Sequence, residues 1–273
     1  MGDKPEHIKW LVDTGERLTT ADRKTVEVWE FRHQPDEAVL SAWAKHFRNH
    51  YCSDDQIDEL IENTEFKTHA DYLVKIKFPD EKKAPGPSIR AGDFGEILIA
   101  DFLEYTLGFH VPRTRYIDKT VRNESTKGCD IIGFRFVENG KWSRGNVLAI
   151  FEAKAQFSGT RPSPRLQDAV DGSINDLNRR AESLNATRQR FLDINDREAA
   201  KRVNRFQSPL DNPYRELYRA AALFAIELFD CASIETAIVS GHPRNDRLKL
   251  IVVRGVAIMD LVHKLYQRAA DEA

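Results

Sequence analysis

Cysteine is scarce in this chain, and several common sequence signatures are missing. The three cysteines lie far apart and form no C-x-x-C pair; they are Cys52, Cys129 and Cys231. This number and spacing indicate neither a disulfide framework nor a zinc ribbon. The sequence also lacks a G-x-x-x-x-G-K-[ST] loop. The chain is therefore not expected to hydrolyse nucleoside triphosphates, and any ATP dependence would belong to a partner.

Long apolar runs are missing as well. No segment approaches the roughly 18 to 20 uninterrupted apolar residues that a membrane-spanning helix needs. The first ten residues, MGDKPEHIKW, are charged and contain no apolar segment typical of a signal peptide. We therefore expect a cytoplasmic protein with no membrane contact.

The composition that is present is typical of a globular protein. Hydrophobic residues make up 41% and charged residues 31% of the 273 positions, which argues against a disordered or fibrous chain. The net charge of -2 conceals an acidic stretch over residues 1–70 and a mildly basic one over 71–219. A basic stretch suits a polyanion, but ordinary surface composition is the favoured explanation. Charge alone therefore decides nothing.

A change of composition at KFPDEKKAPGPS, residues 77–88, divides the sequence. Three prolines, a glycine and several charges replace periodic sequence there, as in a linker. We predict an α+β accessory segment at 1–86, suited to docking a partner or to regulation, and a core at 87–273. The accessory segment is expected to contain a strand at 25–33 and helices at 36–51 and 54–64.

The core begins with a predicted helix, which Ser88 can cap and Gly108 ends. Apolar runs predict strands after it, and helical spacing predicts further helices. The expected strands are 109–117, 129–137, 146–156, 235–241 and 248–255, and the expected helices are 167–206, 214–230 and 256–270. This order predicts an α/β fold in which helices cover a mixed sheet.

Two charged residues interrupt the apolar run AIFEAKAQFSG, residues 149–159. Glu152 and Lys154 are two positions apart, so in a strand they point to the same face. An unpaired charge on a buried strand face costs several kcal/mol. The pair therefore requires mutual contact, solvent access or a bound ion.

A second carboxylate is expected to lie beside this pair. Asp130 opens the preceding strand, and antiparallel pairing through the turn at 138–142 would bring it near Glu152. Two carboxylates repel each other unless a cation or proton lies between them, and hard oxygen ligands suit Mg²⁺. Glu96, in the helix before these strands, could complete the site. Lys154 would then stabilise charge on a phosphate, and Gln156 could position water or substrate.

The order of Glu96, Asp130 and Glu152-x-Lys154 on helix, strand and strand resembles the PD-(D/E)xK nuclease superfamily. Cys129 stands at the position of that superfamily's proline. The segments AGDFGEILIADFLEYTLG, STKGCDIIGF and LAIFEAKAQ resemble, more closely, the HamA nuclease family of Hachiman anti-phage systems over residues 88–240.

The resemblance implies an αβββαβ core, a DNA substrate and a superfamily 2 helicase partner of HamB type. It also implies that Asp130 and Glu152 bind Mg²⁺, for which Mn²⁺ can substitute. Lys154 would be the catalytic lysine, and Glu96 would complete the metal centre.

Other features allow more than one reading. Five cations between the first two core strands could contact phosphates or form a solvated loop; they are Arg113, Arg115, Lys119, Arg122 and Lys127. His46, His50 and Cys52 suggest zinc only faintly, and a surface helix is favoured. Two alternatives to a helicase-coupled nuclease stay open. One is a restriction or repair endonuclease that works alone, and the other is an inert nuclease fold that only binds DNA or a partner.

Overall fold

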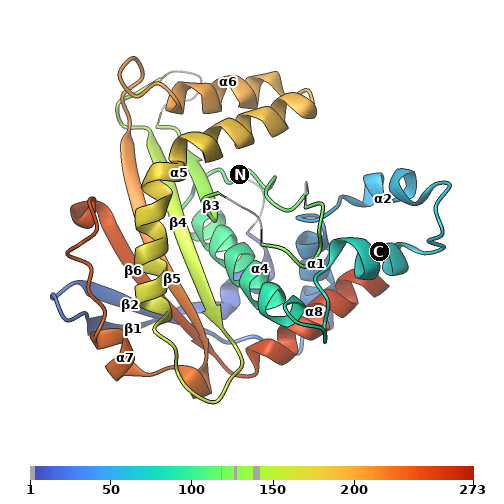
Figure 1. Cartoon of the computed structure of the whole chain (residues 1–273), viewed down its shortest axis with the longest axis horizontal. Helices are drawn as coiled ribbons and strands as arrows, with labels where there is room; N and C mark the ends of the chain where they lie inside the picture. The colour runs from blue at the N-terminus through green and yellow to red at the C-terminus, as the bar shows by residue number, and fades with distance from the viewer. Residues whose placement is uncertain (1–3, 118, 126–127, 138–141) are drawn as a thin grey trace.

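The computed structural model describes residues 4–117, 119–125, 128–137 and 142–273. Within them, six strands form one mixed sheet in the order β1-β2-β6-β5-β4-β3 (Figure 1). The β1–β2 and β3–β4 pairs are antiparallel, whereas β2–β6, β6–β5 and β5–β4 are parallel. The strands are β1 (Leu11–Thr19), β2 (Thr25–Phe31), β3 (Ile131–Arg135), β4 (Val147–Gln156), β5 (Arg215–Ala225) and β6 (Leu248–Gly255).

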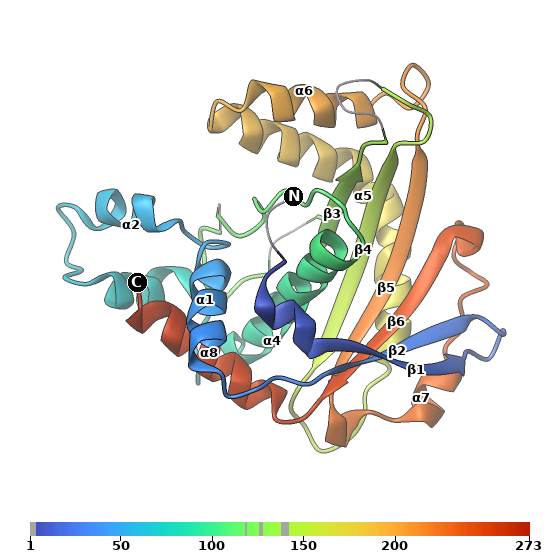
Figure 2. The ribbon, with the colours of Figure 1, turned by 180° about the vertical axis from the view of Figure 1, so that it is seen from behind.

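Helices cover both faces of the sheet, as the two opposite views show (Figures 1 and 2). Helices α1, α4 and α8 pack on one face, and α5 and α6 lie on the other. Further short helices lie in the connections. The helices are α1 (Glu37–Arg48), α2 (Asp54–Ile61), α3 (His69–Tyr72), α4 (Gly86–Asp101), α5 (Arg165–Asp193), α6 (Arg197–Phe206), α7 (Cys231–Glu235) and α8 (Ile258–Asp271). The expected class, a mixed sheet covered by helices, is confirmed.

Successive side chains of strand β4 point alternately into the two hydrophobic cores on either side of the sheet. Ala149 and Phe151 belong to the core beneath α4, whereas Leu148 and Ile150 belong to the core beneath α5. Because side chains of a strand alternate between faces, Glu152 and Lys154 fall on the α5 side. The two charged residues therefore lie on the face of the sheet that α5 covers.

Several predicted elements differ from the observed ones. Residues 214–230 were expected to be a helix, but Arg215–Ala225 is strand β5, which pairs on both edges with parallel strands. Its alanine-rich run is buried on both faces, so tertiary packing overrides the helix propensity of alanine. The predicted strand at 109–117 is reduced to one isolated bridge, between His110 and Phe134. Residues 235–241 form no strand, and β1 was not predicted.

The first 86 residues share the sheet and core of the rest. Strand β2 pairs in parallel with β6, near the other end of the sequence. Helix α1 packs against α8, and Arg48 of α1 donates a 2.9 Å hydrogen bond to the carbonyl of Ala269. The sequence boundary proposed at residue 86 therefore has no counterpart in the sheet, because strands from both sides of it pair with each other. No helix in the described part of the chain combines the length and apolarity needed to cross a membrane.

Candidate active site

The candidate site lies where β3 begins and β4 ends. Ile131 pairs with Phe151, so Asp130 lies at the level of Glu152 on the neighbouring strand. The predicted antiparallel pairing of these two segments is present. Strand β4 is itself held between β3 and β5, which fixes the direction in which its side chains project.

Lys154 contacts both carboxylates. Its ammonium group forms an ion pair with Oε1 of Glu152 and lies 3.8 Å from Oδ2 of Asp130. The same Asp130 oxygen accepts a 3.2 Å hydrogen bond from the backbone N–H of Ala153. Three charges from two strands thus meet at one point, although a third of the Lys154 side chain stays exposed.

The electrostatics of this cluster disfavour two ionised acids without a further cation. Burial, and after it the negative charges of Asp130 and Asp176, raise the pKa of Glu152 above its usual value, although Lys154 opposes the shift. Burial lowers the pKa of Lys154, but the two carboxylates outweigh it and raise the pKa overall. Lys154 is therefore held in its charged form, and one lysine does not neutralise the surrounding acids.

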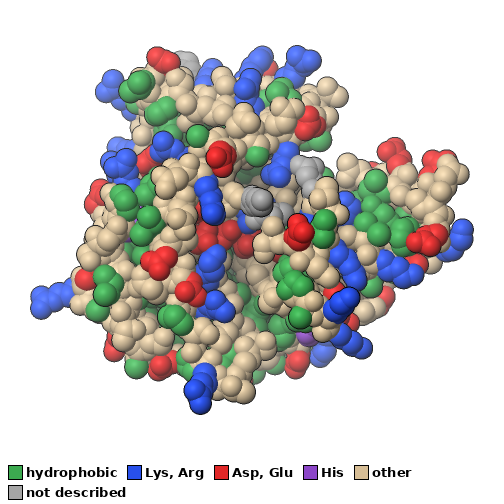
Figure 3. Space-filling view, viewed as in Figure 1, with side chains coloured by type: hydrophobic (Ala, Val, Ile, Leu, Met, Phe, Trp, Pro, Cys, Tyr) green, Lys and Arg blue, Asp and Glu red, His purple; other side chains and the backbone are tan. Residues whose placement is uncertain are grey.

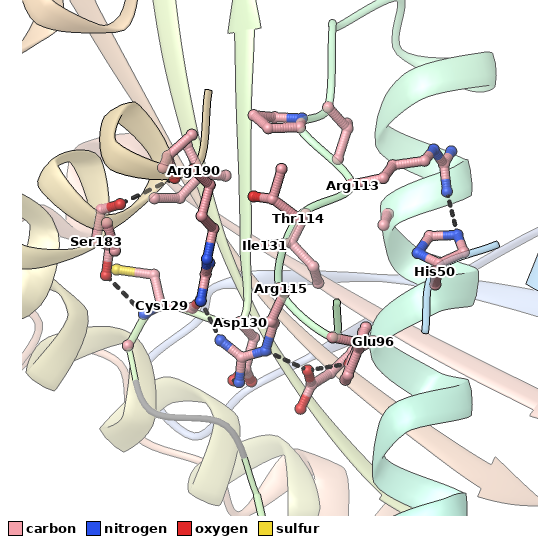
Figure 4. Close-up of a pocket in the computed structure, with 18 of the residues that line it drawn as sticks. His50, Glu96, Arg113, Thr114, Arg115, Cys129, Asp130, Ile131, Ser183 and Arg190 are labelled. Carbon is pink, nitrogen blue, oxygen red and sulfur yellow. Dashed lines mark hydrogen bonds and ion pairs between the residues drawn. The ribbon is translucent and has the colours of Figure 1, made fainter. Parts of the chain in front are cut away.

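Glu96 approaches the same cluster from α4, on the other side of the sheet edge (Figure 4). The Arg115 guanidinium lies between it and Asp130, with Nε 2.9 Å from Glu96 and Nη2 2.8 Å from Asp130. Tyr116 also donates a hydrogen bond to Glu96. Glu96 and Asp130 are therefore joined through the Arg115 guanidinium.

These groups line a cavity of about 220 Å³ that opens to solvent. It extends from Glu96, Arg115 and Asp130 to Arg190 on α5 and His50 after α1. Figure 3 shows a hollow in the middle of the molecular face, with acidic side chains in its depth and lysine and arginine around it. An anionic ligand reaching this hollow would meet cations before the acids.

Four of the five loop cations proposed for phosphate contact pair with acids of their own chain. Arg115 is placed as described above, and Lys127 lies outside the described residues. The other three contacts are Arg113 with Asp101 and Glu104, Lys119 with Asp93, and Arg122 with Asp80. The Lys119 side chain is only 3% exposed. Contact of these cations with DNA stays a prediction.

Gln156 is engaged with the loop that follows β4. Its amide nitrogen donates to the carbonyl of Arg161 at 2.9 Å, and its amide oxygen accepts from the N–H of Ser163 at the same distance. Both ends of the amide thus shape the loop. A direct role for Gln156 toward water or substrate stays a prediction.

Asp176 on α5 was not singled out from the sequence. It is fully buried, and its charge raises the pKa of Glu152. A signal was available, because Asp176 stands on the buried stripe of α5 that includes Ala169 and Ser173. An acid on an otherwise apolar or small-residue stripe is uncommon.

Gly172, one turn before Asp176, allows α5 to approach β4 closely. A Cβ at this position would lie 2.7 Å from Cδ of Glu152. Gly172→Ala is therefore expected to lower the free energy of unfolding and to displace Glu152, although alanine normally stabilises a helix by about 1 kcal/mol. Gly92→Ala in α4 is the matched control, because a Cβ there meets nothing within 4 Å. Urea denaturation that shows equal stabilisation by both changes would contradict this.

A second ionic cluster surrounds Asp101 at the end of α4. Its oxygens lie 2.9 Å from Nε2 of His7 and 2.9 Å from Nε2 of His46, and 2.7 Å from Nη2 of Arg113. Burial favours the neutral acid, but His46, Arg113 and the histidine hydrogen bonds hold the pKa of Asp101 well below its usual value. His50 is buried and accepts from Arg113, so the favoured surface helix is wrong at this position. One ligand atom from each of His7, His46 and Asp101 lies within 4.8 Å of the other two, a grouping that could hold a metal ion, and Arg113 pairs with the same Asp101 oxygen as His46.

Comparison with known proteins gives one family. The family model described as HamA matches residues 6–269 of the chain. The match extends from before β1 into the last turn of α8 and includes all six strands of the sheet. None of the curated proteins matches the chain.

Proposed function

The chain belongs to the HamA family, and we propose that it is a metal-dependent deoxyribonuclease. Family membership supports a role as a component of the Hachiman anti-phage defence system. The observation that carries the proposed chemistry is the contact of one lysine, Lys154, with both Asp130 and Glu152. Oxygen ligands beside a fixed ammonium group suit phosphodiester hydrolysis, in which negative charge must be stabilised.

The donor set fits a divalent cation of the Mg²⁺ type. Asp130 and Glu152 supply carboxylate oxygens, which Mg²⁺ and Mn²⁺ prefer, and burial makes their mutual repulsion costly. Asp130 and Glu152 would hold the ion, and Glu96 is the third predicted ligand. Because Arg115 contacts both Glu96 and Asp130, Glu96 would join them at one ion only after Arg115 moves.

Residues of the chain would have separate roles in the reaction beside the cation. When bound, the cation would activate the attacking water and offset the charge of the phosphodiester. Lys154 holds its proton and would donate hydrogen bonds to a non-bridging phosphate oxygen. The buried backbone of β4 fixes the positions of Glu152 and Lys154, so little reorganisation is needed during the reaction.

We also propose a superfamily 2 helicase of HamB type as the partner, as the family implies. A translocating partner would supply much of the phosphate-binding affinity that the paired loop cations of this chain do not offer. Residues 1–86 are not a separable docking module in this proposal, since β1 and β2 belong to the sheet.

The test is cleavage of supercoiled and linear plasmid DNA by the purified chain. We expect cleavage with Mg²⁺ or Mn²⁺, alone or with a helicase of HamB type, and none with EDTA. Sequence-specific cleavage by the isolated chain would favour a stand-alone restriction or repair endonuclease. DNA binding without cleavage, in every metal and with the partner, would support an inert binding module instead.

A further inference from the structure

Two histidines and one aspartate from three separate elements meet at the end of α4. His7 lies in the 3₁₀ turn Glu6–Trp10 before β1, His46 lies in the last turn of α1, and Asp101 is the last residue of α4. The fold thus brings together side chains that are 94 and 55 positions apart in the sequence. Their ligand atoms lie within 4.8 Å of one another, which is close enough for one metal ion to bind all three residues.

The two imidazole rings present the same nitrogen to Asp101. Nε2 of His7 lies 2.9 Å from Oδ2, and Nε2 of His46 lies 2.9 Å from Oδ1. The His7 ring also stacks on Trp43, which precedes His46 by three residues on α1, with ring centroids 4.6 Å apart and 9° between the planes. Packing therefore fixes the direction of the His7 ring, as a metal ligand requires.

The protonation states at this position suit a metal ion. Burial lowers the pKa of His7, although the hydrogen bond and the charge of Asp101 oppose the shift, so the ring is neutral at pH 7. The pKa of Asp101 is held well below its usual value, so the carboxyl group is ionised. Metal ions bind neutral imidazole and ionised carboxylate. Each ring would carry its proton on Nδ1 and leave the lone pair of Nε2 for the ion.

Arg113 is a cation that a metal ion would meet in this cluster. Its Nη2 lies 2.7 Å from Oδ1 of Asp101, but the same guanidinium also pairs with Glu104 and donates to Nε2 of His50 at 2.6 Å. Two carboxylates therefore share one guanidinium, and with the histidines neutral these groups carry one unit of negative charge. A carboxylate has two oxygens, so Arg113 can stay on Oδ1 while Oδ2 binds an ion.

We propose that His7, His46 and Asp101 form a binding site for Zn²⁺. Zinc in proteins takes imidazole nitrogens and carboxylate oxygens, whereas Mg²⁺ prefers oxygen ligands. The side chain of His46 is 21% exposed, so water can fill a fourth position from that side. The ion would hold α1 and the segment before β1 against the end of α4, the helix that carries Glu96. This role is structural and separate from Mg²⁺ binding beside Lys154.

A cluster held by hydrogen bonds and ion pairs alone would behave differently. It would bind no Zn²⁺, and His46→Gln would change the melting temperature equally with and without Zn²⁺. His69→Gln is the matched control, because Nε2 of His69 lies 2.7 Å from Oδ1 of Asp58 in an exposed pair that lies outside the three-residue group.

The experiment measures Zn²⁺ binding to the full chain after EDTA treatment and removal of EDTA, by competition with a fluorescent chelator. Excess Mg²⁺ is present to occupy the carboxylate site beside Lys154. We expect one Zn²⁺ per chain and a higher melting temperature with Zn²⁺. His46→Gln should weaken Zn²⁺ binding at least about tenfold and reduce the melting shift, whereas His69→Gln should match the wild type. Equal affinity in His46→Gln and wild type, or no Zn²⁺ binding by the wild type, would overturn the proposal.

His46→Cys keeps the test decisive if the glutamine variant does not fold. A thiolate is itself a zinc ligand, so this variant should retain Zn²⁺. With Co²⁺ it should show a sulfur-to-cobalt charge-transfer band that the wild type, with its three native cysteines, lacks. A folded variant without this band would refute ligation at position 46.

The location of the ion is tested separately with Glu152→Gln, which should bind Zn²⁺ as the wild type does. Zn²⁺ binding that is lost in Glu152→Gln but kept in His46→Gln would place the ion beside Lys154 and overturn the proposal. A wild type that loses Zn²⁺ only in the His46 variants, but cleaves DNA with no metal, supports this inference and refutes the proposed nuclease function.

Discussion

Lys154→Met is expected to reduce DNA cleavage by about 100-fold to 1,000-fold while the protein stays folded. Methionine keeps the length and the apolar stem of lysine but removes the ammonium group that contacts Glu152 and Asp130. The lost charge would have stabilised negative charge on the phosphate during hydrolysis. The loss should appear in the rate at saturating DNA, because the group acts on the reacting centre.

Single-turnover cleavage of a labelled duplex measures this effect, with circular dichroism to establish folding and DNA binding measured in EDTA. Lys249→Met is the control, since Lys249 is an exposed lysine on β6. We expect that control to cleave at the wild-type rate. Unchanged cleavage by a folded Lys154→Met protein would assign the lysine a structural role only and would remove the main support for the proposed chemistry.

Asp101→Asn is expected to lower the free energy of unfolding by about 3 to 5 kcal/mol. The carboxylate is completely buried and holds His7, His46 and Arg113 together. An amide cannot accept from all of these donors, and its own NH₂ group faces them. The buried guanidinium of Arg113 would also lose an opposite charge at 2.7 Å.

The lowered pKa of Asp101 also predicts how the stability difference between wild type and variant changes with pH. Because the folded pKa of Asp101 lies below the unfolded value of about 3.9, its charge stabilises the fold above that pH. The difference between wild type and variant should therefore persist above about pH 4 and shrink as the pH falls further. Urea denaturation in EDTA at several pH values measures it. Asp58→Asn is the control, because Asp58 forms an exposed pair with His69 and should change stability by less than about 1 kcal/mol.

The strands that carry the candidate site were predictable because their signals are local. The segments 129–137 and 146–156 are apolar, and the turn between them favours antiparallel pairing, which the structure has. Glu152 and Lys154 interrupt an apolar pattern, and this predicted that charged groups meet on their face of the strand. The structure places Lys154 in contact with both Glu152 and Asp130. Their catalytic roles stay predictions.

The remaining features depend on tertiary contacts that local pattern does not encode. Strand β5 contains the alanine-rich run AAALFA, whose helix propensity yields to its place between two parallel strands. Arg115 was grouped with loop cations, and only the fold reveals that it lies between Glu96 and Asp130. Asp176 shares a stripe of small residues with Ala169 and Ser173 in a long polar helix, and the packing of α5 on β4 shows that this stripe is buried.

The position of β6 in the sheet determines when this protein can fold during synthesis. Strand β6 lies between β2 and β5, although it is the last of the described strands to be made. A ribosome must therefore release residues up to about 255 before the early hairpin can join the strands that carry Asp130 and Glu152. Such long-range pairing slows folding relative to local contacts. A nascent chain that lacks β6 consequently lacks the strand that joins β2 to β5, so the six-stranded sheet is not yet assembled.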